Sequence, residues 1–336
     1  MLPVGKLSPE LLQRLLSQAP SQDPRVLIGP GIGLDCAVID FGEKLLVLKS
    51  DPITFATDEI GWYAVQVNAN DIATTGAEPR WMMATLLLPE RRTQPELVER
   101  IASQVYAAAQ SIGVSVIGGH TEITYGLDRP ILAGTMIGEV SRQNLVTPQG
   151  ARPGDRLLLT KGVPIEGTAI LARELPDRLS RELSPAELEQ ACGFLHEPGI
   201  SILKDARIAI LAGKVTAMHD PTEGGLASAL WELAEASRCS LVVDTSRVPV
   251  PDLSSRMCRL LGLDPLAAIA SGALLLTASP ADAPRIRQAL EAEGIRCADI
   301  GRVEPGPPAV WDISPPRPAL LPRPTRDEIA KLFEQA

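Results

Sequence analysis

One short segment of the chain brings together polar side chains that could bind a ligand. Residues 67–79 (VNANDIATTGAEP) begin as an apolar helix, yet Asn68, Asp71 and Thr75 follow one another at intervals of three and four residues. This spacing predicts that the three side chains lie on one face of the helix. Aspartate is unfavourable inside a helix because its short side chain competes for backbone hydrogen bonds. Asp71 is therefore either a binding group or part of a solvated stripe, and the spacing fits both.

Two more carboxylates, Asp35 and Asp51, flank predicted strands. Asp35 precedes a strand and Asp51 ends one, so both could point inward with Asp71. Carboxylates that converge without histidine or thiolate ligands suit Mg²⁺, which prefers oxygen ligands and retains water and phosphate. Lys49, two residues before Asp51, could stabilise the charge of a transferred phosphoryl group. As isolated residues, Asp35 and Asp51 fit an ordinary turn and an ordinary strand end equally well.

A glycine-rich segment at 29–33 (GPGIG) could wrap a phosphate with its backbone N–H groups. Gly31 and Gly33 are its candidate binding residues. Because no Gly-Lys-Ser/Thr follows and no strand precedes the segment at the Rossmann spacing, it is neither a P-loop nor a dinucleotide-binding motif. A flexible loop is the alternative interpretation.

A second pair of glycines, Gly118 and Gly119, follows a predicted buried strand. Glycine allows a ligand to approach the backbone closely, and Thr121 adds a hydroxyl group, but a tight turn explains the pair equally well. His120, which lies between them and Thr121, could serve as a general acid or base, or it could be structural.

The segment 219–226 (HDPTEGGL) has the features of a helix start. Asp220 fits an N-cap, Pro221 the first helical position and Glu223 the third, which needs no functional explanation. The same start would expose backbone N–H groups that suit a phosphate. Gly224 begins a glycine pair that is costly in a first helical turn, which mildly favours the binding interpretation.

The composition indicates a soluble two-domain protein and argues against several other classes of protein. The chain has 336 residues, 45% of them hydrophobic, which is enough for two domains. A formal net charge of −9 and an aromatic content of 3% argue against nucleic-acid binding. No segment approaches about 18 uncharged apolar residues and no signal core is present, so we expect a soluble, cytoplasmic protein. The cysteines and histidines are too scattered for a zinc site.

Strands and helices alternate along the chain, which is typical of an α/β fold. In the first half, the patterns predict helices over about 58–75 and 94–112 and strands over 37–39, 45–48, 81–88, 114–117 and 131–140. A turn and a buried strand near 150–162 begin the second half. Helices are predicted near 169–174, 185–195, 200–212 and 226–237, and strands at 241–243, 273–278 and 298–303. Residues 305–324 are rich in proline and should form an extended connector.

Six segments, in this order, resemble the motifs of the aminoimidazole ribonucleotide (AIR) synthetase, or PurM-like, superfamily, whose members bind ATP through several magnesium ions. The segments are GIGLDCAV (31–38), KSDPI (49–53), VNANDIATTGAEP (67–79), IGGHTE (117–122), GARPGD (150–155) and HDPTEGGL (219–226). A match to any one of these motifs is weak evidence for the family, whereas six matches in the family's order over most of the chain are specific evidence.

The resemblance implies an α/β (α+β) fold with an N-terminal ATP-binding domain over 1–149, a C-terminal domain over 150–312, and a tail with a terminal helix over 313–336. The N-terminal mixed sheet would form a barrel across a homodimer, the C-terminal domain would be an α/β sandwich, and ATP would lie between the domains. The implied metal ligands are Asp35, Asp51, Asp71 and Asp220. The residues implied to approach the phosphates are Gly31, Gly33, Asn68, Gly118, Gly119, Thr121 and Gly224.

The branch that the chain resembles most is the HypE-like hydrogenase maturation factor, which dehydrates a protein-bound thiocarboxamide to a thiocyanate. The similarity lies in segments 222–237 and 261–272. That branch carries its acceptor cysteine in a Pro-Arg-Xaa-Cys tail, whereas the last cysteine here is Cys297. It also usually has a glutamate where this chain has Ser271. We therefore expect a relative that keeps the ATP site but does not modify itself.

Three functions remain open on the sequence. The leading hypothesis is an enzyme that uses Mg²⁺ and ATP to phosphorylate an oxygen, a carbonyl or amide oxygen being one option, of a small-molecule or protein acceptor. Its candidate catalytic residues are Asp71, Lys49 and His120. The alternatives are an ATP-binding regulatory or scaffold subunit without turnover and a small-molecule kinase of the thiamine-monophosphate kinase type.

Overall fold

The computed structural model describes residues 7, 9–18, 20, 23–31, 34–54, 58–314, 316 and 318–334. The chain divides into two compact units. The N-terminal unit comprises Pro20–Pro30 and Asp35–Leu145, and the C-terminal unit comprises Met1–Ala19, Gly31–Leu34 and Val146–Ala336. None of the helices in the described part of the chain combines the length and the apolar character that crossing a membrane requires. The predicted domain limits at 149 and 312 stay predictions.

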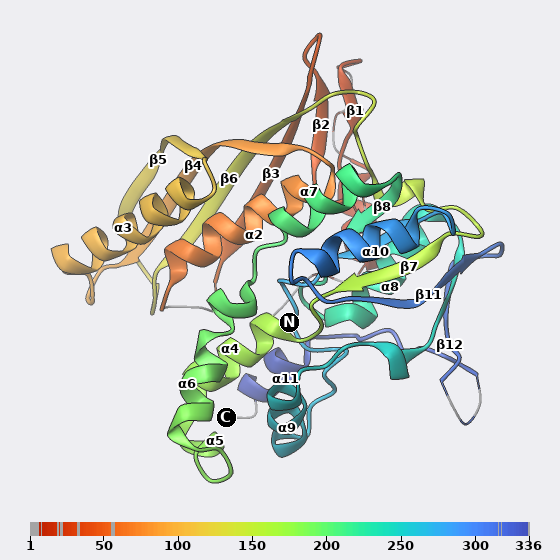
Figure 1. Ribbon diagram of the computed structural model, residues 1–336. Helices are drawn as coiled ribbons and strands as arrows, with labels where there is room; N and C mark the ends of the chain where they lie inside the picture. The colour runs from red at the N-terminus through yellow and green to blue at the C-terminus, as the bar shows by residue number, and fades with distance from the viewer. Residues whose placement is uncertain are drawn as a thin grey trace. The chain divides into compact units, whose positions relative to one another are not determined.

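A mixed sheet of six strands forms the N-terminal unit (Figure 1), in the order β1-β2-β3-β6-β4-β5. The strands are β1 (Val26–Ile28), β2 (Ala37–Asp40), β3 (Leu45–Ile53), β4 (Glu78–Pro89), β5 (Ser115–Thr124) and β6 (Ile131–Val140). Neighbouring strands are antiparallel except β4 and β5, which are parallel. Every predicted strand of this half is present, although β3 runs past Asp51 instead of ending there.

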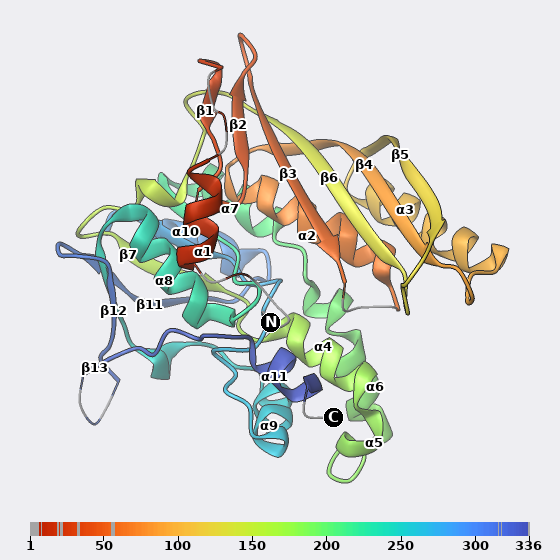
Figure 2. The same cartoon turned by 180° about the vertical axis from the view of Figure 1, so that it is seen from behind.

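Two helices, α2 (Ile60–Thr74) and α3 (Pro95–Ser111), cover one face of this sheet (Figures 1 and 2). All residues of α2 except Trp62 are buried. Glycines on β6 allow the helix to lie close to the sheet: a Cβ atom at Gly138 would come within 2.4 Å of Ile72, and one at Gly134 within 2.6 Å of the Asn68 amide. Because α2 is held this closely, the direction of its polar side chains is fixed by the packing.

The segment Gly118–Glu122 corrects one prediction. It lies inside β5, an edge strand that is exposed along nearly its whole length, and not in a tight turn after a buried strand. A Cβ atom at Gly119 would lie 1.8 Å from the carbonyl oxygen of Ala84 on β4. Close pairing with β4, next to the register shift at Met82–Met83, therefore accounts for Gly119.

The C-terminal unit contains a second mixed sheet, of seven strands in the order β13-β12-β9-β11-β7-β10-β8. The strands are β7 (Arg156–Thr160), β8 (Val215–His219), β9 (Ser240–Val243), β10 (Leu275–Ala278), β11 (Cys297–Glu304), β12 (Ala309–Asp312) and β13 (Ala319–Leu320). The predicted connector at 305–324 thus contains two strands. β12 belongs to the sheet because it pairs in parallel with β9, far away in the sequence.

Helices of the C-terminal unit include α4, which follows β7, and α8, which follows β8 (Figure 1). The helices are α1 (Pro9–Leu16), α4 (Ile165–Glu174), α5 (Pro176–Leu179), α6 (Pro185–Gly193), α7 (Leu203–Ala212), α8 (Gly225–Ser237), α9 (Asp252–Leu261), α10 (Ala283–Ala292) and α11 (Glu328–Glu334). Apolar residues of α8 and of the central strands, such as Leu230, Leu159 and Leu241, form the core. The unit buries its sheet as expected for an α/β arrangement.

Candidate functional site

Three carboxylates of the N-terminal unit surround one ammonium group. The Nζ atom of Lys49 lies 3.0 Å from Oδ2 of Asp71, 3.4 Å from Oδ2 of Asp51 and 3.9 Å from Oδ1 of Asp35. We call these four residues the Lys49 cluster. The structure thus brings together three of the four carboxylates predicted to bind metal, and the lysine predicted to act with them.

Different elements position each member of the cluster. Lys49 and Asp51 lie two residues apart on β3, so their side chains leave the strand on the same face. Asp71 comes from the middle of α2, and Asp35 from the segment just before β2. The cluster therefore depends on the packing of α2 against β3 and on the β2–β3 hairpin.

Asn68 holds Asp51 in place through the backbone. Its amide oxygen accepts a hydrogen bond of 3.0 Å from the N–H of Asp51. Its amide nitrogen donates to the carbonyl oxygens of Asp51, at 3.3 Å, and Ala64, at 2.8 Å. Both ends of the fully buried side chain are thus engaged. Asn68 has a positioning role here, and its contact with a phosphate stays a prediction.

Lys49 stays protonated although it is buried. Burial disfavours an ammonium, but the carboxylates of Asp71, Asp35 and Asp51 outweigh it and hold the pKa of Lys49 well above its usual value of 10.5. Asp71 is the most deeply buried carboxylate, with a side chain only 4% exposed, whereas the side chain of Asp51 is 39% exposed. The cluster therefore runs from a buried end at Asp71 to an accessible end at Asp51.

The donor set of the cluster suits a divalent cation. With three ionised carboxylates and one ammonium, the formal charges leave an excess of two negative charges, which one Mg²⁺ would neutralise. The oxygens already converge on a cation, which is Lys49 itself. Asp35, Asp51 and Asp71 are the residues that would hold the metal in this unit.

A thiol lies beside the cluster, and the sequence analysis did not single it out. Cys36 is buried, and its Sγ–H donates to the backbone oxygen of Asp71 at 3.3 Å. It also acts electrostatically on Lys49. The signal that could have identified it is its place next to Asp35 in the segment GIGLDCAV.

The structure does not bring His120 to the Lys49 cluster. His120, Gly118, Gly119 and Thr121 lie on β5, and two strands, β6 and β4, separate β5 from β3 in the sheet. At about 4.8 Å per strand this separation is about 14 Å. The ring of His120 is mostly exposed and lies 3.2 Å from the Glu122 carboxylate. The catalytic interpretation of His120 therefore lacks support within one chain.

Of the first glycine-rich segment, the structure describes residues 29–31. Gly31 forms an isolated bridge with Leu34, and a Cβ atom at Gly31 would come within 2.7 Å of the Leu34 side chain. Gly33 lies outside the described residues. The phosphate-binding role of both glycines stays a prediction.

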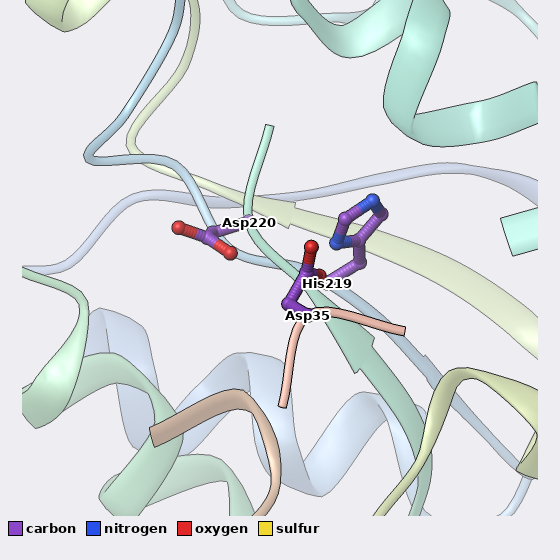
Figure 3. A group of neighbouring side chains, drawn as sticks. All are labelled: Asp35, His219 and Asp220. Atoms are coloured by element: carbon purple, nitrogen blue, oxygen red, sulfur yellow. The ribbon is translucent and has the colours of Figure 1, made fainter. Parts of the chain in front are cut away.

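His219 and Asp220 lie at the carboxyl end of β8 in the C-terminal unit (Figure 3). Asp220 is 1% exposed, and the two side chains offer ligand atoms within 4.8 Å of each other. Nε2 of His219 lies 2.7 Å from Oε2 of Glu232 on α8, which fixes the orientation of the ring. Glu232 was not singled out from the sequence, because its pairing with His219 spans the loop and half of α8.

The helix predicted near 226–237 is present, whereas the interpretation of Asp220 as its N-cap is wrong. Helix α8 begins at Gly225, five residues later, with Gly224 as its N-cap at a φ of 79°. A Cβ atom at Gly225 would lie 2.5 Å from the carbonyl oxygen of Leu266, so only glycine fits there. The N–H of Gly224 donates to Oδ2 of Asp327 at 2.8 Å. A carboxyl group of the protein thus accepts from this N–H group, and Asp220 is not the N-cap. The phosphate-binding role of Gly224 stays a prediction.

Comparison with known proteins assigns a family domain to each half of the chain. Residues 33–140 match the N-terminal domain of the AIR synthase related proteins, and residues 152–312 match their C-terminal domain. A protein of Methanocaldococcus jannaschii named for hydrogenase expression and formation is 31% identical, over 78% of this chain and 78% of its own. The carbamoyl dehydratase HypE of Cupriavidus necator is 32% identical, over 75% of this chain and 70% of its own.

The fold has a counterpart among solved structures. A crystal structure of the hydrogenase maturation protein HypE in complex with ATP aligns with 95% of this chain and 91% of its own, with a TM-score of 0.72 and 24% identity. At this identity the likeness shows a shared fold, a mixed α/β arrangement with two mixed sheets.

Proposed function

We propose that this chain, which belongs to the AIR synthase related family, is an enzyme that uses Mg²⁺ and ATP to phosphorylate an oxygen atom of its substrate. The observation that carries the proposal is the convergence of Asp35, Asp51 and Asp71 on Lys49. Such a cluster has an excess of negative charge at an accessible edge, which is what a magnesium–polyphosphate complex requires. The relative that was crystallised with ATP supports the choice of nucleotide.

Each residue of the cluster has a distinct role in this proposal. Asp51 and Asp35, which are partly exposed, meet the metal first, and the buried Asp71 anchors it. Lys49 is left to neutralise charge that develops on the transferred phosphoryl group. Bound Mg²⁺ would neutralise the charge of the polyphosphate. A carbonyl or amide oxygen is one acceptor that fits, as in the relative named a carbamoyl dehydratase.

Calorimetry and product analysis test the proposal together. ATP titrated into the protein with Mg²⁺ should bind, and binding should fall by at least tenfold when EDTA removes the metal. ADP should form in the same samples over time. Binding that does not depend on Mg²⁺ would contradict the proposal, and tight binding without ADP for any acceptor tried would favour the scaffold alternative.

We also propose that the chain works as a homodimer through the open face of the N-terminal sheet. Helices α2 and α3 cover one face only (Figure 2), and β5 is an edge strand. Ile117 and Ile123 on β5 are each 56% exposed, and Met83 on β4 is 41% exposed. A row of exposed apolar residues on a sheet edge is a pairing surface. The barrel predicted across a dimer would cover it.

Sedimentation velocity tests the dimer. The wild-type protein should sediment at twice the mass of the chain, and Ile123→Arg should shift it to the monomer because a charge cannot be buried in the pairing face. Leu211→Arg, at an exposed position on α7, is the matched control and should stay dimeric. A wild-type protein that sediments as a monomer at micromolar concentration would refute the proposal.

A further inference from the structure

The outer edge of the N-terminal sheet is a long and almost fully exposed strand. β5 stands last in the strand order and pairs only with β4 in the described part of the chain. Its ten residues, SVIGGHTEIT, include neither lysine nor proline, the residues that usually protect an edge strand from pairing. Five of them are β-branched, which favours a place inside a sheet. The composition of β5 is thus that of a strand that pairs on both sides.

A two-fold axis restricts how such a strand can pair with its own copy. If one residue lies opposite a second residue of the partner, the second must lie opposite the first. Antiparallel strands meet this condition. Residues that lie opposite each other project on the same face of the sheet, so the centre of the pairing falls on a single residue. Each possible register is therefore defined by the residue that faces its own copy.

Charge selects the register centred on Thr121. In this register His120 lies opposite the partner's Glu122, and Glu122 opposite the partner's His120. Within one chain, Nε2 of His120 already lies 3.2 Å from Oε2 of Glu122. Imidazole and carboxylate groups would therefore alternate both along each strand and across the pair. A register centred on Glu122 would instead place two carboxylates opposite each other, which is destabilising.

The glycines of β5 fit the same register. Ile123, which is 56% exposed, comes to lie opposite the partner's Gly119. No side chain can stand at Gly119, because a Cβ atom there would lie 1.8 Å from the carbonyl oxygen of Ala84. The isoleucine therefore has room against bare backbone, and its exposed apolar surface is covered.

An exposed tyrosine follows β5 and also finds a partner. Tyr125 is 85% exposed and comes to lie opposite the partner's Ile117, which is 56% exposed. Aromatic and β-branched side chains form favourable pairs across strands. A shallow hollow of about 430 Å³ adjoins this position, lined by Tyr106 and Gln110 on α3 and by Val116. The ring of Tyr125 would cover part of this hollow on the partner.

We propose that β5 is self-complementary and pairs antiparallel with β5 of a second copy, in the register that sets Thr121 opposite itself. This pairing rests on the homodimer proposed above and adds the strand, the register and the side chains that join the two copies. It also gives a role to the segment Gly118–Glu122, which the Lys49 cluster does not use. In the dimer, His120 binds the partner's Glu122, and Gly119 accommodates the partner's Ile123.

A single introduced cysteine tests the register in the full-length protein. In Thr121→Cys the two new thiols would face each other with Cβ atoms about 5 Å apart, which is close enough for a disulfide. After oxidation with copper phenanthroline, most of the chain should run as a covalent dimer on a non-reducing gel. Dithiothreitol should return it to the monomer. The wild type, which has free cysteines of its own, sets the background.

Two neighbouring positions are the matched controls for the crosslink. In His120→Cys and in Glu122→Cys, each thiol would lie diagonally from its own copy, at about 7–8 Å, so the yield of covalent dimer should be about tenfold lower. A register centred on either residue would instead give its cysteine variant the highest yield. The three variants together therefore identify the residue at the centre of the pairing.

An exchange of charges tests the pairing of side chains. Glu122→Lys places a lysine opposite the partner's His120, and His120→Glu places carboxylates opposite each other. Each variant alone should raise the Kd of the dimer by about tenfold, measured by sedimentation velocity. In an equal mixture the Kd should return to within about threefold of the wild type, because the lysine of one variant then faces the new glutamate of the other. Glu99→Lys, at an exposed position on α3, is the control and should dimerise as the wild type does.

The possible outcomes separate the register from the dimer. If the wild type sediments as a monomer, the proposed dimer and the pairing of β5 are both refuted. If the wild type is a dimer but Thr121→Cys gives no more covalent dimer than the wild type or the two cysteine controls, the pairing at Thr121 is refuted and the dimer stands. A mixture of folded charge variants that associates no better than each variant alone also refutes the pairing. The cysteine variants decide the question if a charge variant fails to fold.

Discussion

Asp71→Asn is expected to lower ATP turnover by roughly 100-fold, because the buried carboxylate that anchors the metal loses its charge. Asp71 is the carboxylate nearest to Lys49, at 3.0 Å, and its side chain is 4% exposed, so water cannot substitute for it. Initial rates of ADP release at saturating ATP and Mg²⁺ measure the effect.

The fold should survive this change. Removal of one partner of a buried ion pair lowers the free energy of unfolding by about 3–5 kcal/mol. The decrease should be smaller here because Asp35 and Asp51 remain beside Lys49. Asp128→Asn, at an exposed carboxylate of the same unit, is the control and should behave as the wild type. Turnover of Asp71→Asn within twofold of the wild type would show that this carboxylate does not hold a catalytic metal.

Lys49→Met is expected to have the largest effect on stability, because three carboxylates then face one another without a cation. The free energy of unfolding without metal should fall by about 3–5 kcal/mol. Mg²⁺ should restore part of this loss, since it supplies the missing positive charge at the same oxygens. Thermal denaturation in EDTA and in Mg²⁺ measures both, and turnover should remain low even with metal.

The comparison with the wild type makes this prediction specific. The increase in Tm on addition of Mg²⁺ should be clearly larger for Lys49→Met than for the wild type, in which the ammonium already occupies part of the cluster. Lys44→Met removes a mostly exposed lysine that pairs with Glu139, and its response to Mg²⁺ should match the wild type. An equal Mg²⁺ response in all three proteins would contradict a metal site at the cluster.

The Lys49 cluster could be predicted in part because two local rules fix it. The period of a strand puts Lys49 and Asp51 on one face, and the spacing of three residues puts Asn68 and Asp71 on one face of α2. Sequence spacing does not predict that these faces of β3 and α2 pack against each other. That packing depends on distant contacts, such as the close approach of Gly134 to Asn68. The bonds of the Asn68 amide to the backbone of Asp51 could not be predicted for the same reason, and its contact with a phosphate stays a prediction.

The errors share a cause, which is interaction between residues far apart in the sequence. Asp220 is not the N-cap of α8, and Gly225 must be glycine because the carbonyl oxygen of Leu266 leaves no room for a side chain, a contact that no local pattern reveals. Gly119 is required by its pairing with β4 and not by a turn.

A crystal structure with Mg²⁺ and a non-hydrolysable ATP analogue tests the central claim most directly. We predict a metal ion ligated by carboxylate oxygens of Asp51 and Asp71, with Asp35 bound to it directly or through water, and phosphate oxygens completing its coordination. Nζ of Lys49 should then contact the γ-phosphate. A nucleotide bound elsewhere, with Lys49 still enclosed by its three carboxylates and no metal among them, would contradict the account.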